Sequence, residues 1–380
     1  MTIQDTDKFL VNRSGTSHQL NSYDLMSNLQ DTDLMLVNRA GQSYKVTGAE
    51  VKAELGGGSG AKYPSFNIDD CFKSFHYTGN GGTQSITVGF DCRESAGGCL
   101  VLINGSSNNN QVTWFADTKM GTGKLGRWSQ NVHSNYSNAV TSFDSNGFTI
   151  GNNTNINDNN VVYKCMVFKV QPGFFDMQTY GPSVNSIVPT TVNHNLGAQP
   201  CMIFLRAQNF DQANMYYRPG GMGTYSPHGS RSNLNLNPGF FDSEPNATSF
   251  TVASSQSNRA NTTYIAYLFG GAPAGGDEDY PVVYGTYKGG AGVKVVTNGT
   301  KPQFAVFKGL EGPSSINGLY LDKGNIDDPG TYSNCKGWSF NTLESLAGRF
   351  TWDADEVTFL NPSTELGDTQ YFYFYYFIGR

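Results

Sequence analysis

The chain has 380 residues, of which 15% are charged, 13% are aromatic and 45 are glycine. An ordinary soluble domain is about 25% charged and disordered chains are poor in aromatics, so this composition argues against disorder and predicts β-structure with many turns. The net charge of −6, with no long basic run, argues against nucleic acid or an anionic membrane as the main partner.

The beginning of the chain shows neither a secretory signal nor a membrane span. It reads MTIQDTDKFLVNR, without a basic stretch followed by an apolar one, so we expect no cleaved signal. The longest apolar run, at 371–378, is far shorter than the roughly 18 residues that a membrane helix needs. We therefore expect no membrane insertion.

A short repeat occupies the first residues. DTDKFLVNRSG at 5–15 recurs as DTDLMLVNRAG at 31–41, an offset of 31 − 5 = 26 residues. Each copy predicts an apolar strand, a turn and a second short strand. In the second copy, Thr47 and Glu50 have the spacing of a capping box at the start of a helix over 49–55.

A unit of about 26 residues cannot bury its own apolar face, so it must pack on its sister copy or on a partner. We therefore interpret residues 1–55 as two attachment modules, with a plain independent domain as the alternative. A glycine-rich run, GGGSG at 56–60, then predicts a linker, which we place at 56–72.

Three longer repeats follow the linker. CLVLIN at 99–104 aligns with CMIFLR at 201–206 and QFAVFK at 303–308, with offsets of 201 − 99 = 102 and 303 − 201 = 102. Two further sets of strand-like segments recur in the same order at similar spacing: 148–150, 250–252 and 357–359, and the closing strands 163–168, 264–269 and 371–376.

Short strands separated by Asn-Gly, Pro and Ser clusters are typical of antiparallel sandwiches. We expect a mainly β chain with three tandem antiparallel sandwich-like domains at 73–172, 173–276 and 277–380, preceded by the small α+β repeat pair. The last strand, YFYFYYF at 371–377, is aromatic at every position. A strand that is apolar on both sides is buried on both sides, so we expect it at a subunit or domain interface.

The sequence offers almost no catalytic motif. The five histidines are scattered, no nucleophile elbow is present, and the six cysteines lack metal-ligand spacing and resemble reduced core residues. GTGKLG at 121–126 matches a dinucleotide-binding pattern, but the poor helix start after it favours a glycine loop between strands. The Asn-rich segment 152–158 lacks the Asp ladder of a calcium loop, which leaves a weak cation site as an alternative. We expect no enzyme, no cofactor and no metal.

Aromatic side chains could instead contact sugars. Trp114 with Asp117, and the pair Tyr216 and Tyr217, occupy the same part of their repeats. Exposed aromatics beside carboxylates would suit glycan stacking, whereas buried aromatics would be core or interface packing. Both interpretations remain open at this point.

These motifs resemble those of a known group of proteins. The DTDxxLVNRxG repeat, followed by SYKVTGAEVKAEL at 43–55, resembles N-terminal modules of phage tail-associated structural proteins, particularly those of cyanophages. The long repeat resembles a β-rich domain of the same virion proteins in three phrases: YTGNG at 77–81, VTSFDSNGFTI at 140–150 and QPGFFD at 171–176.

The resemblance implies a virion structural protein, most directly a tail fibre or tail-attached adhesin, assembled in the host cytoplasm. It implies docking to other tail proteins through residues 1–55, a homotrimer by analogy with fibres, and contact of the β domains with a host surface glycan. It carries over no catalytic residue. The alternatives are a capsid decoration or head-fibre protein and, in another class, a glycan-cleaving tail spike enzyme, which would need paired carboxylates in a groove.

Overall fold

The computed structural model forms two compact units, Met1–Lys62 and Tyr63–Arg380, which we call the head and the body. The structure describes residues 8–13, 16–21, 34–39, 42–47, 64–105, 113–127, 133–181, 188–208, 213–217, 225–226, 235–236, 241–253, 257–273, 280–290, 293–296, 302–309, 319–322, 336–338, 343–345, 350–352, 356–359 and 372–379.

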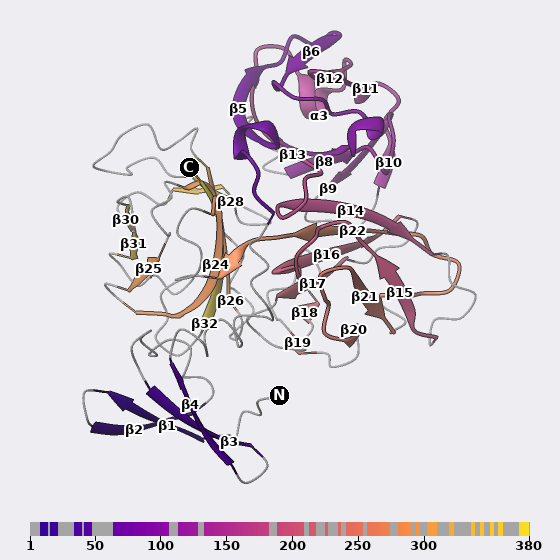
Figure 1. Ribbon diagram of the computed structural model, residues 1–380. Helices are drawn as coiled ribbons and strands as arrows, with labels where there is room; N and C mark the ends of the chain where they lie inside the picture. The colour runs from indigo at the N-terminus through magenta and orange to yellow at the C-terminus, as the bar shows by residue number, and fades with distance from the viewer. Residues whose placement is uncertain are drawn as a thin grey trace. The chain divides into compact units, whose positions relative to one another are not determined.

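The head contains a four-stranded antiparallel sheet built from the two short sequence repeats (Figure 1). Its strands are β1 (Lys8–Arg13), β2 (Thr16–Asn21), β3 (Leu34–Arg39) and β4 (Gln42–Thr47), in the order β2-β1-β3-β4. In each repeat these strands are the apolar strand and the second short strand that the sequence predicts. The helix predicted at 49–55 and the glycine-rich run at 56–60 lie outside the described residues.

The two hairpins of the head are joined through their equivalent first strands. Val11 pairs with Met35 and Asn12 with Leu34, so β1 and β3 run antiparallel. In this antiparallel pair the two residue numbers always add up to 46, as for 11 and 35. The repeat offset is 26 residues, so exchanging the two copies replaces 11 by 37 and 35 by 9, and these numbers also add up to 46. The sheet therefore has an approximate internal twofold relation.

The body is antiparallel β-structure in which one strand order occurs three times, and this confirms the predicted mainly β fold. The first repeat has a large sheet, β10-β9-β8-β7-β13-β5, and a small sheet, β11-β12-β6. Its strands are β5 (Phe72–Thr78), β6 (Gln84–Thr87), β7 (Cys99–Gly105), β8 (Thr113–Asp117), β9 (Lys124–Arg127), β10 (His133–Asn135), β11 (Val140–Asp144), β12 (Gly147–Ile150) and β13 (Val162–Lys169).

The second repeat has the same order, β14-β22-β16-β17-β18-β19 in the large sheet and β15-β21-β20 in the small one. Its strands are β14 (Phe175–Tyr180), β15 (Thr190–Asn193), β16 (Met202–Ala207), β17 (Ala213–Tyr217), β18 (Tyr225–Ser226), β19 (Asn235–Leu236), β20 (Phe241–Ser243), β21 (Ser249–Val252) and β22 (Tyr264–Phe269).

The third repeat keeps the arrangement with β23-β24-β32-β26-β27, β25-β31-β30 and a separate β28-β29 pair. Only the short edge pairing of β23 with β24 is parallel among the described strands. The strands are β23 (Ala272–Pro273), β24 (Val282–Lys288), β25 (Lys294–Val296), β26 (Pro302–Gly309), β27 (Leu319–Asp322), β28 (Lys336–Trp338), β29 (Leu343–Ser345), β30 (Phe350–Trp352), β31 (Glu356–Phe359) and β32 (Phe372–Gly379).

Helical structure is sparse in the described residues: η1 (Ile68–Asp70), η2 (Glu94–Ala96) and α3 (Thr154–Asn157). None of these elements has the length and hydropathy that a membrane-crossing helix requires. Residues 64–71, at the end of the predicted linker 56–72, belong to the body, because Ile68 and Cys71 are buried in its core.

Each of the first two large sheets buries one face against the small sheet of its own repeat. In the first repeat, Val101 and Val167 of the large sheet pack in one cluster with Phe148 of the small sheet. In the second repeat, Leu205 packs in the corresponding cluster with Phe250. These sandwich cores explain why one set of alternating strand positions is apolar.

The opposite faces of all three large sheets contribute to a single apolar cluster, which we call the shared core. Its sheet residues are Phe72, Leu100, Leu102, Phe115, Met166 and Phe168 of the first repeat; Phe175, Met177, Met202, Phe204, Ile265, Tyr267 and Phe269 of the second; and Val282, Tyr284, Phe304, Val306, Phe374, Tyr376 and Ile378 of the third. The last strand is therefore buried on both faces, as predicted, and one of those faces meets the other repeats.

The pairing registers correct one alignment made from the sequence. Phe304 occupies the position of Met202 (304 − 202 = 102), and these residues pair with Ile378 and Phe269 respectively. Tyr373, rather than Tyr371, therefore corresponds to Tyr264. The segment between β31 and β32 is therefore two residues longer than the sequence alignment assumed. The error was hard to see in the sequence, because a shift of two residues leaves each side chain of a strand on the same face of the sheet.

Candidate functional site

Trp114, one of the candidate sugar-stacking residues, lies in the sandwich core of the first repeat. Its side chain is only 3% exposed, and the Arg127 guanidinium lies 4.9 Å from the ring centroid. The Tyr136 ring meets it edge-on at 5.9 Å. Trp114 is thus a packing residue, which favours the core interpretation over the glycan one. Tyr216 and Tyr217 are in β17, and their side chains lie outside what the structure describes.

The glycine motif at 121–126 connects two strands. Gly121 and Gly123 have positive φ angles of 81° and 71°, and β9 begins at Lys124. A pyrophosphate cradle needs a helix after the loop, and here a strand follows. The prediction of a glycine loop between strands is confirmed.

The Asn-rich segment at 152–158 forms α3 and its caps. Asn153 accepts a hydrogen bond from Asn155 N at 3.0 Å, which caps the helix. The buried Asn157 amide donates to the carbonyl oxygens of Gly82 at 2.6 Å and Gly151 at 2.8 Å. These amides act as structural connectors. Within the described residues, no group of three or more His, Cys, Asp or Glu side chains is placed to hold a metal ion.

The cysteines in the described residues are buried free thiols. Burial raises the pKa of Cys71 to about 12 and that of Cys99 well above its usual range, which suppresses the reactive thiolate. Cys335 lies outside the described residues, and so does a run of three acidic residues, Asp-Glu-Asp at 277–279. His194 is also structural, because its Nδ1 accepts from Leu196 N and its Nε2 lies 3.1 Å from the Asn246 carbonyl oxygen.

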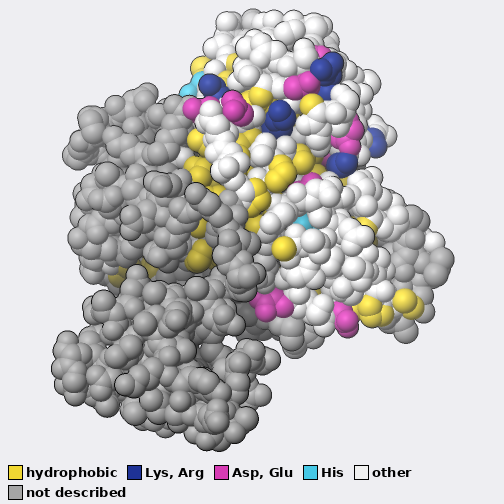
Figure 2. Space-filling model, viewed as in Figure 1, with side chains coloured by type: hydrophobic (Ala, Val, Ile, Leu, Met, Phe, Trp, Pro, Cys, Tyr) yellow, Lys and Arg dark blue, Asp and Glu magenta, His cyan; other side chains and the backbone are white. Residues whose placement is uncertain are grey.

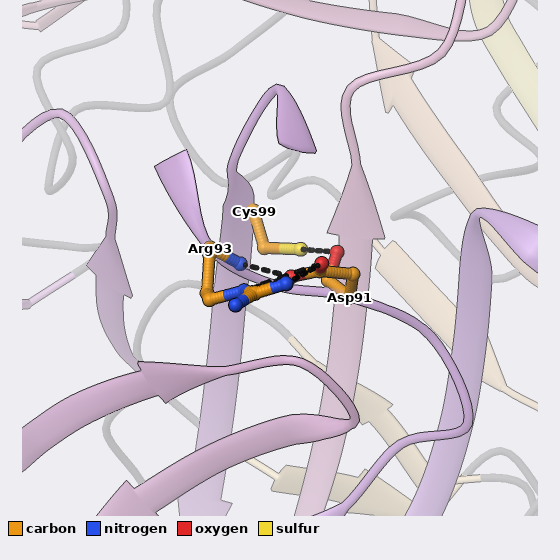
Figure 3. Close-up of polar contacts among 3 residues, drawn as sticks. All are labelled: Asp91, Arg93 and Cys99. Atoms are coloured by element: carbon orange, nitrogen blue, oxygen red, sulfur yellow. Dashed lines mark hydrogen bonds and ion pairs between the residues drawn. The ribbon is translucent and has the colours of Figure 1, made fainter. Parts of the chain in front are cut away.

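An exposed ion pair fixes the loop between β6 and β7 (Figure 3). Arg93 Nε donates to Asp91 Oδ1 at 3.0 Å, and Nη2 donates to Oδ2 at 2.6 Å. The Cys99 thiol points at the Asp91 backbone carbonyl from the start of β7, with Sγ and O 4.0 Å apart. Chiefly through its side-chain hydrogen bonds, Arg93 lowers the pKa of Asp91 to about 2. The two side chains thus satisfy each other's hydrogen-bonding groups, and we interpret the pair as a structural contact that stabilises the loop.

Charged side chains do not gather elsewhere on the face that Figure 2 shows. In its described part, acidic and basic side chains lie scattered among uncharged ones. Large hydrophobic side chains exposed on the described surface are limited to Val162, at 45%, and Val188, at 52%. The described surface thus carries little charge, and Figure 2 also shows hydrophobic side chains along the middle of this face.

The most unusual polar arrangement is buried where the first two large sheets meet. We call Asp117, Tyr267 and Arg206 the junction cluster. Tyr267 Oη donates to Asp117 Oδ2 at 2.8 Å, and Met120 N donates to Oδ1 at 2.7 Å. Arg206 Nη2 donates to the backbone oxygen of Arg127 at 2.9 Å. Asp117 and Arg206 are both 0% exposed.

Burial dominates the electrostatics of the junction cluster. It raises the pKa of Asp117 to about 6, although hydrogen bonds and the Arg206 charge favour the carboxylate. The Arg206 guanidinium lies 4.2 Å from the Phe115 ring centroid, so a ring of the first sheet faces a cation of the second. No substrate can reach these enclosed groups, and they join the two repeats. Sequence reasoning left open whether Asp117 and Trp114 lie at a surface or in a core. It missed this partnership, because Asp117 and Tyr267 are 150 residues apart.

Comparison with known proteins leaves this picture unchanged: no protein-family model matches the chain, and no curated protein matches its sequence.

Proposed function

We propose that the chain is a structural protein of a phage virion, a tail fibre or tail-attached protein. In this proposal, residues 1–55 dock to other tail proteins and the body presents its β repeats to the host surface, where it contacts a glycan. The protein acts in the virion after assembly in the host cytoplasm, and it is not an enzyme.

The observation that supports the proposal is the division of the chain into two compact units. A small unit made of two paired hairpins is separate from a large body whose three repeats share one core. Buried polar groups such as Asp117 and Asn157 are engaged in holding this scaffold together. A body of β repeats with a separate small unit suits a particle appendage, and the sequence motifs resemble those of phage tail proteins.

Deleting residues 1–55 tests the attachment role. We expect particles to lose the protein while the truncated chain keeps the β circular dichroism spectrum of the parent. The matched control is the full chain with a scrambled 56–60 segment, which should still be incorporated. Incorporation of the truncated chain would refute the assignment. Gold labelling of particles would then distinguish a tail position from the alternative of a capsid decoration or head fibre.

A glycan array read beside a product assay tests the host-contact role. Binding without release of shortened sugar supports adhesion, whereas sugar release would favour a glycan-cleaving spike. The predicted homotrimer is tested by light scattering of the full chain at micromolar concentration.

A further inference from the structure

The three repeats use the same sheet face to meet each other. The registers align Leu100, Met202 and Phe304, each of which pairs with the corresponding closing strand. All three belong to the shared core. By the same registers, Met166, Tyr267 and Tyr376 are equivalent and also lie in the shared core. The interior face of each repeat is thus a variant of one surface.

Contacts between aromatic rings join every pair of repeats. The Phe168 ring of the first repeat lies 5.8 Å from Phe269 of the second and 5.7 Å from Phe304 of the third. Phe269 lies 5.9 Å from Tyr376 of the third repeat. The three faces therefore close on one another, each covering the apolar surface that the others would otherwise expose to water.

A protein with one such repeat would have to find two further chains to cover this face. In this chain the second and third copies of the repeat follow the first in tandem. The closing strands are buried on both sides, because β22 is buried throughout and β32 is buried from Phe374 to Gly379. The same face cannot also bind another chain. The described outer surface has two exposed large hydrophobic side chains, fewer than the apolar centre of a stable oligomer interface requires.

Both units have outer strands that pair on one side only among the described strands, and the head sheet is the simpler case. In the order β2-β1-β3-β4, the outer strands β2 and β4 each pair on one side among the described strands. Such edges are templates for pairing with another chain. We propose that the body is a closed single-chain counterpart of a homotrimer and is monomeric by itself, so that any contact between copies is left to the head.

The proposal is tested on the full chain, first by light scattering over a concentration series. A mass of 41.4 kDa, that of one chain, supports it directly. A larger mass leads to the second step, in which ¹⁴N and ¹⁵N chains are mixed and cross-linked at lysine. Mixed-isotope links are then expected only among Lys8, Lys45, Lys52 and Lys62 of the head.

Mixed-isotope links between body lysines such as Lys73, Lys119 and Lys288 would overturn the proposal, because they place body surfaces of two copies together. Links of this kind would also reveal exchange of repeats between chains, a known hazard of tandem repeats. Body links within one isotope, expected in either case, serve as the internal control. The outcome is independent of the virion proposal, which concerns incorporation rather than the surface used for self-association.

Discussion

Replacing Phe168 by alanine would remove a ring that contacts all three repeats. The ring is 1% exposed and lies 5.1 Å from Phe72, 5.8 Å from Phe269 and 5.7 Å from Phe304, centroid to centroid. Truncating a buried Phe to Ala costs roughly 3–5 kcal/mol, so we expect a loss of about 4 kcal/mol in the free energy of unfolding.

The size of the body converts this loss into a temperature. The body has 380 − 62 = 318 residues. With about 2.1 cal/mol/K of unfolding entropy per residue, its total is about 0.7 kcal/mol/K. The F168A midpoint should therefore fall by about 6 °C, as measured by circular dichroism.

Hydrogen exchange resolved by peptide tests where the loss is felt. We expect F168A to lower protection in β13, β22 and β32, one closing strand from each repeat. The matched control is Phe148→Ala, which removes an equally buried ring from the sandwich core of the first repeat. Its effect on exchange should centre on the first repeat. If F168A, like the control, lowers protection only in the first repeat, the shared core does not couple the repeats and the reasoning fails.

Three further outcomes are expected. Asn157→Ala should cost about 2–3 kcal/mol in urea unfolding, because two backbone carbonyls lose donors at 2.6 and 2.8 Å. Burial raises the pKa of Asp117 from 3.8 to about 6, so its contribution to stability is complete below pH 3.8 and is lost as the pH rises through 6. The stability of the parent minus that of D117N should fall by about 3 kcal/mol between pH 3.5 and 7.5, at 1.36 kcal/mol per pKa unit. Gly147→Ala should cost more than about 2 kcal/mol, because its φ is +143° and a Cβ would lie 2.0 Å from Ile86 O.

Each of these outcomes has a control. Gly89→Ala shares a positive φ, here +105°, but its Cβ would meet nothing within 4 Å, so it separates backbone strain from collision. Equal losses of unfolding free energy for Gly147→Ala and Gly89→Ala would contradict the expectation that a steric collision adds to the cost at Gly147. A pH-independent difference between the parent and D117N would show that Asp117 does not titrate in this range. For Asn157, Asn155→Ala removes a neighbouring amide and should cost little.

The strands and repeats were predictable because they depend on local pattern. CLVLIN and its two counterparts became β7, β16 and β26, each beside the closing strand of its sheet. The all-aromatic last strand also revealed that both its faces are buried. A sequence does not show which surfaces cover a face, however, and the shared core depends on contacts more than 100 residues apart.

The glycan interpretation of Trp114 and Asp117 could have been tested from the sequence alone. The two residues are three apart on one strand, and successive side chains alternate between faces. They therefore point to opposite sides of β8, where Trp114 enters the sandwich core and Asp117 enters the junction with the second repeat. Their partners, Tyr136 and Tyr267, could not be foreseen, because the pairing is set by the packing of whole sheets.

Carrying three copies in tandem changes what a single mutation can do. In an assembly of three identical chains, every substitution appears at three places at once, and a harmful one is harmful threefold. Here the positions equivalent to Asp117 are Tyr217 and Asp322. Each face has already diverged on its own, so selection can alter one side of the body while the other two keep the properties they had.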